Sequence, residues 1–496
     1  MKRIEFSLKN VAIWTGLLLS LVLTFFVVYS PHLSYPYPYH IDEWHHISQS
    51  KRLLAGDYMN SQEASGFGVI EMGFHVLLLG FSKVFDLIAN YKYLPASWAV
   101  LTAWTFYFVV SRKTGNRLIG IFAIVFFASL KSNVNILGLW FFTPLIFSFP
   151  FLILYSYFFS EGVLRENKRY LVGSLALMFF LIPSYATSVL FLIPTALVFL
   201  YLNREYVKRE SRLFLVFLII PILGMAFYKM AIGLSWGEVF DHLQKSLQFK
   251  YGWGVLELKN SWTELYSVTG YLLAAVGALY ILIQKKIREY SFYLIWAASL
   301  LFSIEIYREF GVSFLAPYQR NLYYFGLIMP LFSALGLHYL ISQIKSWHLP
   351  KVLTRPVKIG LPVLLLAVTL GLIFINYYKI PWQLDLYKVI NKGDYDTLLF
   401  MKTLAPARVM TTTYLGTALY PIAGHRPYAT IYFLGNPEVV DQFYNSGNCG
   451  FREEIIKNRR LDYVISPFPL DCDWPIVYDQ QDQVYRVSQI YLNQNE

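Results

Sequence analysis

The sequence predicts a polytopic α-helical membrane protein with a small α/β domain at its C-terminal end. The chain has 496 residues, of which 56% are hydrophobic and only 15% are charged. Apolar runs recur along it at roughly the 17–25 residues that a helix needs to cross a bilayer. These runs are apolar on every face, whereas a soluble protein of this size would show amphipathic periodicity. Composition and run length together therefore indicate a membrane protein.

We predict eleven membrane-spanning helices. Their ranges are 11–30, 94–110, 117–130, 143–160, 170–182, 186–202, 213–230, 264–284, 291–306, 320–341 and 359–378. The first run follows Lys2, Arg3 and Lys9, as a secretory signal would. It is too long for the apolar region of a signal and lacks a small-x-small cleavage site, so we interpret it as an uncleaved anchor.

Basic residues predict the orientation of these spans, because Lys and Arg accumulate in cytoplasmic loops. With a cytoplasmic N-terminus, the inner segments contain the basic clusters Lys2/Arg3/Lys9, Arg112/Lys113/Arg117, Arg165/Lys168/Arg169, Arg204/Lys208/Arg209/Arg212, Lys285/Lys286/Arg288 and Lys345/Lys351/Arg355/Lys358. The short outer loops contain only Lys131 and Arg308. The net charge of +11 therefore reflects membrane orientation, and no basic stripe indicates nucleic-acid binding. We expect a multi-pass protein of the plasma membrane.

Residues 69–88 are apolar but are interrupted by Glu71, His75, Lys83 and Asp86. If they crossed the membrane, every later basic cluster would lie outside. We therefore expect an amphipathic helix in the outer interface. The stretch 31–93 then forms one large outer loop of a transmembrane domain that covers residues 1–378.

Residues 379–496 have a different composition, richer in charged and turn-forming residues. Short strand-like runs appear here: "ARVMTTTY", "YATIYFL", "DYVISPF" and "VYRVSQIYL". They alternate with "NPEVVDQFYN" and "REEIIKNRR", which is typical of a small α/β domain. Eleven spans place this domain outside the cytoplasm. It contains both cysteines, Cys449 and Cys472, and we expect a disulfide that contributes roughly 3 kcal/mol in an oxidising compartment; two unpaired thiols are the alternative.

The stretch "HIDEWHHISQSKRLLAGDY", residues 40–58, follows the first predicted span directly. An Asp-Glu pair opens a helix here, an interfacial helix follows, and an outer domain ends the chain. In these three features the sequence resembles the GT-C superfamily of integral-membrane glycosyltransferases, which includes protein O-mannosyltransferases, aminoarabinose transferases and oligosaccharyltransferase catalytic subunits. Similarity at the level of residues is confined to this loop.

The resemblance implies transfer of a sugar from a polyprenyl-phosphate donor to an acceptor at the outer membrane face, with inversion at the anomeric carbon. The departing phosphate is weakly basic, so the reaction needs no general acid. It needs a base for the acceptor's proton and a cation for the phosphate. Asp42 or Glu43 can act as the base, and Asp42 matches the family's acidic residue. The alternative is that Asp42 only caps the helix that follows.

Other polar residues of the loop are further candidates. Glu71 is similar in position to an acidic residue of aminoarabinose transferases, although it could simply face water at the interface. His40, His45 and His46 could bind a divalent metal ion with Asp42. Hydrogen bonds from His45 and His46 to sugar hydroxyls or phosphate explain these residues equally well.

Oligosaccharyltransferases place an acidic metal ligand in the second outer loop. The corresponding segment here is "LKSNVNILGLW", which contains Asn133 and Asn135 and no carboxylate. This departure weakens the case for a metal-dependent mechanism and argues against an oligosaccharyltransferase.

For the donor phosphate we consider "YREFGVSFLAPYQRNLYY", between the ninth and tenth spans. Arg320 and Arg308 are expected at the outer interface, where Arg can make bidentate contact with phosphate. Snorkelling to lipid headgroups is the alternative. Lys245 is a weaker candidate for phosphate, and Tyr318 is expected to contact substrate.

A transporter, such as a flippase, or a polymerase of lipid-linked saccharides is the alternative function. Transporters usually place ionisable or broken-helix sites at mid-membrane and often have internal repeats. The span centres of this chain carry almost no charge and no repeat is visible. The concentration of charge in outer loops therefore favours the enzyme.

Overall fold

The computed structural model describes residues 8–56, 71–133, 136–232, 235–238, 248–250, 261–346, 351–375, 387–431 and 434–492. The chain divides into two compact units. The first unit comprises Met1–Ser34 and Lys92–Pro381, and the second comprises Tyr35–Tyr91 and Trp382–Glu496. Most of the predicted outer loop 31–93 thus groups with the C-terminal residues, a division that differs from the predicted boundary after residue 378.

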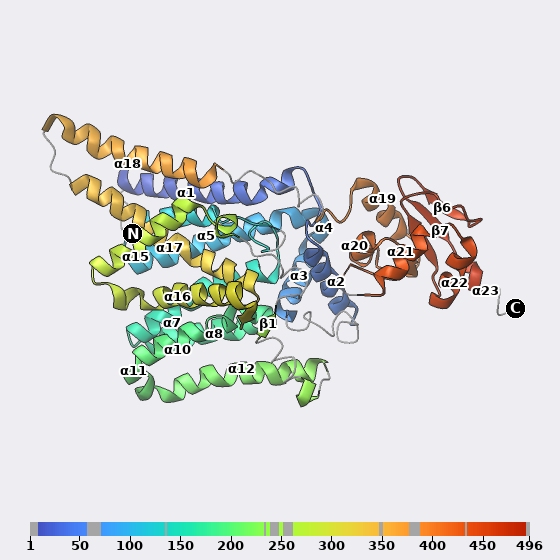
Figure 1. The fold of residues 1–496 in the computed structure, drawn as a ribbon, viewed down its shortest axis with the longest axis horizontal. Coiled ribbons are helices and arrows are strands. Elements are labelled where there is room, and N and C mark those ends of the chain that lie inside the picture. Colours follow the sequence, from blue (N-terminus) through green and yellow to red (C-terminus); the bar gives the residue numbers. More distant parts are fainter. Residues whose placement is uncertain are drawn as a thin grey trace, which may run out of the picture. The chain divides into compact units, whose positions relative to one another are not determined.

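The first unit is a bundle of helices. Its described elements are α1 (Leu8–Tyr29), η1 (Ser30–Leu33), α5 (Leu94–Thr114), α6 (Arg117–Ala128), α7 (Pro144–Leu164), α8 (Lys168–Tyr185), α9 (Thr187–Leu190), α10 (Ile193–Leu202), α11 (Arg204–Arg209), α12 (Ser211–Ile232), β1 (Gln248–Lys250), α14 (Trp262–Leu265), α15 (Val268–Ile283), α16 (Ile287–Phe310), β2 (Val312–Phe314), α17 (Tyr318–Ser346) and α18 (Lys351–Phe374). The short turn η3 (Tyr91–Tyr93) precedes α5. The long helices run alongside one another (Figure 1), and β1 pairs antiparallel with β2.

Each predicted span contains a helix. In the described ranges, five segments are long and apolar enough to cross a membrane: Asn10–Leu33, Leu87–Thr114, Pro144–Leu164, Ile287–Phe310 and Tyr318–Ser346. The remaining predicted spans fall on helices that are shorter or less apolar, so the number eleven stays a prediction, as does the orientation. Helices α7 and α17 bury most of their surface inside the bundle, whereas α1 leaves most of its surface exposed.

The helices α15 and α17 approach each other through two glycines. A Cβ atom on Gly277 would overlap the carbonyl oxygen of Phe332, and one on Gly336 would overlap the carbonyl oxygen of Leu273. Small residues at such a contact let two backbones come together, which is a common way for helices to associate in a membrane.

The second unit combines helices with a small sheet. Its described helices are α2 (Ile41–Ala55), α3 (Met72–Val84), α4 (Leu87–Asn90), α19 (Lys392–Met401), α20 (Thr413–Ala423), α21 (Pro437–Asn445), α22 (Cys449–Arg459) and α23 (Gln489–Leu492). The helix expected within 69–88 therefore exists as α3, followed by α4. Its location at a membrane interface stays a prediction.

The sheet of the second unit has five strands in the order β4-β3-β5-β7-β6. These are β3 (Arg408–Met410), β4 (Arg426–Pro427), β5 (Tyr463–Ser466), β6 (Ile476–Asp479) and β7 (Gln483–Arg486). Strand β3 is parallel to β4 and β5, while β7 is antiparallel to β5 and β6. Val464, Phe443, Trp474 and Tyr485 belong to the apolar core beside it.

One predicted strand is wrong over its described residues. The run "YATIYFL", residues 428–434, lies beyond the two-residue strand β4, and positions 432 and 433 are outside the described residues. Thr430 N–H donates to the carbonyl of Leu434 at 2.9 Å, and Gly435 has φ +72°. Tyr428 N–H still donates to the Val409 carbonyl of β3 at 2.8 Å, but beyond it Thr430 bonds locally to Leu434, and the glycine supplies a conformation outside a strand.

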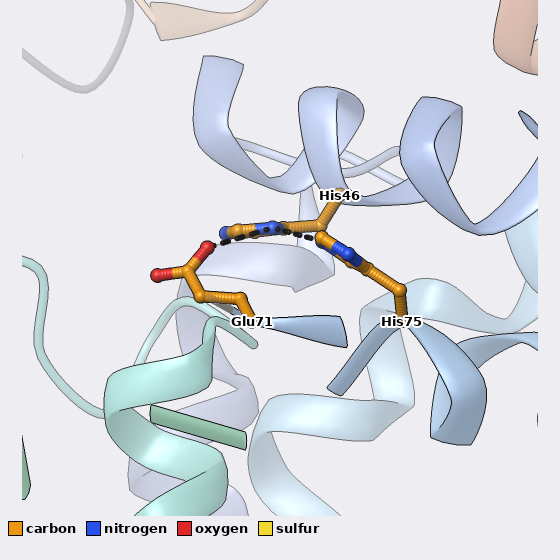
Figure 2. A group of neighbouring side chains, drawn as sticks. All are labelled: His46, Glu71 and His75. Atoms are coloured by element: carbon orange, nitrogen blue, oxygen red, sulfur yellow. Dashed lines mark hydrogen bonds and ion pairs between the residues drawn. The ribbon is translucent and has the colours of Figure 1, made fainter. Parts of the chain in front are cut away.

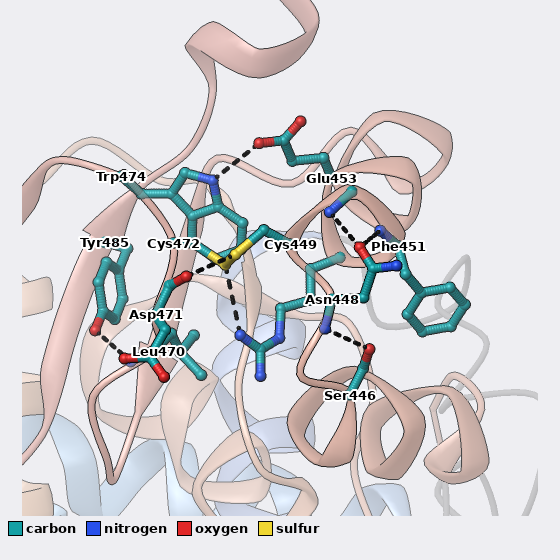
Figure 3. The surroundings of a disulfide bond; sticks show 12 residues. Ser446, Asn448, Cys449, Phe451, Glu453, Leu470, Asp471, Cys472, Trp474 and Tyr485 are labelled. Atoms are coloured by element: carbon teal, nitrogen blue, oxygen red, sulfur yellow. Dashed lines mark hydrogen bonds between the residues drawn. A yellow bond between two sulfur atoms is a disulfide. The ribbon is translucent and has the colours of Figure 1, made fainter.

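The expected disulfide is confirmed: Cys449 and Cys472 are bonded, with their Cα atoms 5.6 Å apart. Figure 3 shows the bridge beside the ring of Trp474. Cys449 is the first residue of α22, and Asn448 caps this helix. The bridge ties α22 to the segment that leads from β5 to β6.

Candidate functional site

Helix α2 begins with a capping arrangement that uses two side chains of the predicted motif. His40 Nδ1 accepts from Asp42 N–H at 3.1 Å, and Glu43 Oε2 accepts from the N–H groups of Tyr39 at 2.7 Å and His40 at 2.9 Å. These bonds satisfy backbone donors that the first turn of a helix leaves without a partner. The alternative that Asp42 caps the helix is therefore wrong, because His40 is the N-cap residue.

The two adjacent carboxylates have different surroundings. Glu43 is fully buried and is committed to the backbone, whereas the Asp42 side chain is 32% exposed. Asp42 Oδ2 lies 3.7 Å from His40 Nδ1. Within the pair, only Asp42 presents a carboxylate that can meet an acceptor hydroxyl or amine.

The rest of α2 is polar but buried. Its buried polar residues are His45, His46, Ser48, Gln49, Ser50 and Arg52. Burial lowers the pKa of His45 to about 4, opposed by the Asp42 carboxylate and assisted by the Arg52 cation. The Arg52 guanidinium lies over the ring of Tyr420, 4.5 Å from its centroid. Burial thus favours the neutral form of the His45 imidazole.

His46 meets two residues of the following segment, Glu71 and His75 (Figure 2). His46 Nδ1 is 2.9 Å from His75 Nε2 and 3.7 Å from Glu71 Oε2. Burial lowers the pKa of His46 well below its usual value, and the neighbouring His75, His45 and His40 lower it further. Each of the three offers one atom that could bind a metal ion, and these atoms lie within 4.8 Å of one another. In the described ranges, this is the group of His, Cys, Asp and Glu side chains that could hold a metal ion.

The possible metal ligands therefore differ from the predicted set. His46 is retained, Glu71 joins it, and His40 and His45 are not members of the group. His40 instead caps α2, with its ring stacked on that of Tyr387 at 4.9 Å. His75 is not among the metal ligands predicted from the sequence. Its spacing of four residues from Glu71, at the start of an expected helix, is the signal that the sequence offers.

The two arginines lie in the first unit and have internal partners. Arg320 donates from Nη1 to the carbonyl of Ile136 at 2.8 Å and from Nε to the hydroxyl of Tyr185 at 3.2 Å. It thereby holds the predicted second outer loop. Asn133 lies in the same loop, where its Oδ1 accepts from Ile136 N–H at 2.8 Å, and Asn135 lies outside the described residues.

Arg308 has an acidic and an aromatic partner as well. Its Nε donates to Tyr318 Oη at 3.2 Å, its Nη1 is 3.5 Å from Glu305, and its guanidinium lies 4.4 Å from the ring centroid of Trp262. Tyr318 is fully buried, and its ring stacks on that of Tyr307 at 4.3 Å. Both side chains thus take part in packing. Lys245 lies outside the described residues.

No protein-family model matches the sequence, and no curated protein sequence matches it significantly. Solved structures do share its fold. One is the oligosaccharyltransferase AglB of the archaeon Archaeoglobus fulgidus in complex with an inhibitory peptide and a dolichol-phosphate, with a TM-score of 0.57 and 12% identity over 92% of this chain and 70% of that chain. The same enzyme in complex with zinc and sulfate has a TM-score of 0.54 and 13% identity over 91% and 68%.

Another is ArnT of Cupriavidus metallidurans bound to undecaprenyl phosphate, with a TM-score of 0.56 and 11% identity over 97% of this chain and 98% of that chain. At these identities the likeness concerns the fold. At that level, the resemblance expected from the first outer loop is confirmed.

Proposed function

We propose, from the premise that this chain has the fold of the GT-C membrane glycosyltransferases, that it transfers a sugar from a polyprenyl-phosphate donor to an acceptor. The observation that carries this proposal is the contrast within the Asp-Glu pair. The Glu43 carboxylate accepts hydrogen bonds from backbone N–H groups at the helix cap, whereas the carboxylate of the preceding residue, Asp42, is accessible.

Asp42 acts as the general base. It takes the proton of the acceptor O–H or N–H group while the acceptor atom bonds to the anomeric carbon. The bond between that carbon and the phosphate oxygen breaks, and the lipid phosphate leaves with the electron pair. Inversion follows from this single displacement. A phosphate needs no proton to leave, so one accessible carboxylate suffices where a glycosidase uses two.

Arg320 is the candidate for the donor phosphate. A guanidinium has five N–H donors and binds phosphate in a bidentate way. Two of those donors reach the Ile136 carbonyl and the Tyr185 hydroxyl, which fixes the side chain in place. Arg308 is the weaker candidate because Glu305 and Tyr318 already engage it. The solved structures of AglB and ArnT contain dolichol-phosphate and undecaprenyl phosphate, which supports a lipid phosphate as the donor class.

The deciding experiment uses purified full-length protein, a panel of polyprenyl-phosphate sugars and Asp42→Asn. His40 and Glu43 supply the cap, so this substitution leaves the start of α2 intact. We expect donor binding to persist while transfer slows by at least ~100-fold, the usual scale for losing a general base.

The matched control is Asp86→Asn, in the same predicted outer loop. Asp86 caps α4 by accepting from Ile88 and Ala89 N–H, and Asn caps a helix about as well as Asp. Its transfer rate should equal that of the wild type. A wild-type rate in Asp42→Asn would remove Asp42 from the mechanism, and translocation of the lipid without transfer would favour the flippase.

A further inference from the structure

We propose that His46, Glu71 and His75 bind one divalent transition-metal ion of the zinc type, and that this ion fastens α3 to α2. The three side chains come from two segments that are distant in the sequence and packed together in the second unit. His75 is fully buried and His46 nearly so, and Glu71 is only 15% exposed. Metal binding here is a property of these residues alone and does not require that the protein transfer sugars.

The geometry favours a common centre over a chain of hydrogen bonds. Both His75 Nε2 and Glu71 Oε2 approach the same atom, His46 Nδ1, as Figure 2 shows. One ring nitrogen carries either a proton or an in-plane lone pair, so it cannot donate to the Glu71 carboxylate and accept from His75 at the same time. An ion between the three atoms would accept a lone pair from each of them.

The distances suit such an ion. Two ligands at about 2.0–2.1 Å from a tetrahedral zinc ion are roughly 3.3 Å apart. The nitrogen–oxygen separation of 3.7 Å and the nitrogen–nitrogen separation of 2.9 Å bracket this value. Small rotations of the two rings would bring the three atoms to coordinating distance.

The ligand types select the class of metal. Two imidazoles and one carboxylate match the three-ligand zinc sites that keep a fourth position for water. Magnesium and calcium prefer oxygen ligands throughout. The two cysteines of the chain are bonded to each other, so no thiolate competes for a soft metal.

The position of the site gives the ion a structural consequence. His46 lies four residues after Asp42, about one turn along α2. An ion bound to His46 would hold this turn against α3 and so act as a positioning element for the turn that carries Asp42.

The test measures metal directly. Full-length protein is purified without a polyhistidine tag, stripped with a chelator, supplied with zinc and desalted, and its metal content is determined by mass spectrometry. We expect about one zinc ion per chain in the wild type and at least a tenfold lower content in His46→Gln and His75→Gln. Glu71→Gln, which keeps a neutral oxygen donor, should retain an intermediate amount.

His45→Gln is the matched control, because His45 is an equally buried histidine adjacent to His46 that lies outside the group. It should keep the zinc content of the wild type. Cobalt substitution and X-ray absorption at the zinc edge, both made on the wild type, should show two imidazole nitrogens and oxygen. This measurement holds even where a histidine variant fails to fold.

Zinc should also raise the melting temperature of the chelator-treated wild type and leave that of His75→Gln unchanged. Absence of zinc from the wild type would overturn the proposal, as would equal contents in the wild type and His75→Gln. Loss of zinc from His45→Gln with retention in His75→Gln would instead support the histidine set expected from the sequence. None of these measurements involves a sugar donor, so their failure is distinct from failure of the transferase proposal.

Discussion

Helix α2 buries polar side chains, whereas helix α12 exposes apolar ones. In α2 the polar residues Glu43, His46 and Gln49 are buried, whereas in α12 the apolar residues Leu218, Ile222 and Leu223 are each more than half exposed. In water both patterns would be unfavourable. The pattern of α12 is expected of a surface that meets lipid. The pattern of α2 is expected of a polar centre inside the protein, which is why α2 is the place to look for chemistry.

Glu43→Ala tests the structural role of the buried polar groups of α2 and has the largest expected effect. The substitution leaves the N–H groups of Tyr39 and His40 without their carboxylate acceptor inside the protein. Hydrogen bonds to charged groups contribute roughly 1.5–3 kcal/mol each, so we expect a loss of about 4 kcal/mol in the free energy of unfolding. Thermal unfolding in detergent would measure it. An unchanged melting temperature would mean that the buried polar groups of α2 are not structural.

The converse test places a charge on α12. Ile222 is 58% exposed, and Ile222→Arg should impair membrane insertion, at a cost of about 3 kcal/mol if the residue lies near the bilayer centre. The matched control is Ile476→Arg on the edge strand β6, where Ile476 is 48% exposed and should meet water. Insertion and folding of that variant should be normal. Equal behaviour of the two variants would contradict a lipid-facing α12.

Much of this contrast could be predicted from the sequence, and part of it could not. The helices of the first unit could be predicted from the long apolar runs. A run long enough to cross a bilayer must form a helix there, and its apolar side chains can face lipid. Composition and spacing alone do not choose between Asp42 and Glu43, since adjacent carboxylates look alike. The resemblance favours Asp42, and the helix cap that engages Glu43 supports the same choice. The partnership of His46 with His75 depends on how α2 packs on α3, and residue spacing does not encode that packing.

The same limit applies to one predicted strand. The run 428–434 has the composition of a strand, yet a local bond between Thr430 and Leu434 follows its first residues. Contacts that composition does not encode decide the outcome here. Tyr318 packs its ring against Tyr307, and its contact with substrate stays a prediction.

Arg320 is a charged residue that is only half-buried. Its side chain donates to the Ile136 carbonyl and the Tyr185 hydroxyl. Arg320→Ala should weaken binding of the lipid-phosphate donor by about 2 kcal/mol, within the range for a hydrogen bond to a charged group. Arg320→Lys should restore only part of this, because the bidentate fork is lost. Titration of donor lipid into purified protein would measure both. Wild-type affinity in both variants would leave Arg320 with the role of holding the second outer loop.

The smallest expected effect concerns a buried carboxyl far along the chain, Asp482, which is 1% exposed. Burial, with repulsion from Asp394, raises the pKa of Asp482 to about 6. The folded protein therefore holds this proton more tightly than the unfolded chain. The associated stability is fully present below about pH 4 and is lost as the pH rises through about 6.

Asp482→Asn should remove this slope and stabilise the protein at pH 8 by ~1–2 kcal/mol. Melting temperatures measured between pH 4 and pH 8 would test it. Asp441→Asn, an exposed position on α21, should leave the slope in place. A slope that persists in Asp482→Asn would assign it to another group.

The glycine contact between α15 and α17 has a consequence for how this protein can diverge. Neither Gly277 nor Gly336 can gain a side chain while the other helix stays in place, because each faces the partner's backbone. Substitution of Gly277 or Gly336 by a larger residue would force the two helices apart along their length. Helix α17 carries Arg320 near its first turn and contacts α6 and α16 as well, so the displacement would spread through the bundle. We expect the two positions to be inherited together as small residues, even in descendants whose outer loops have been rewritten for other substrates.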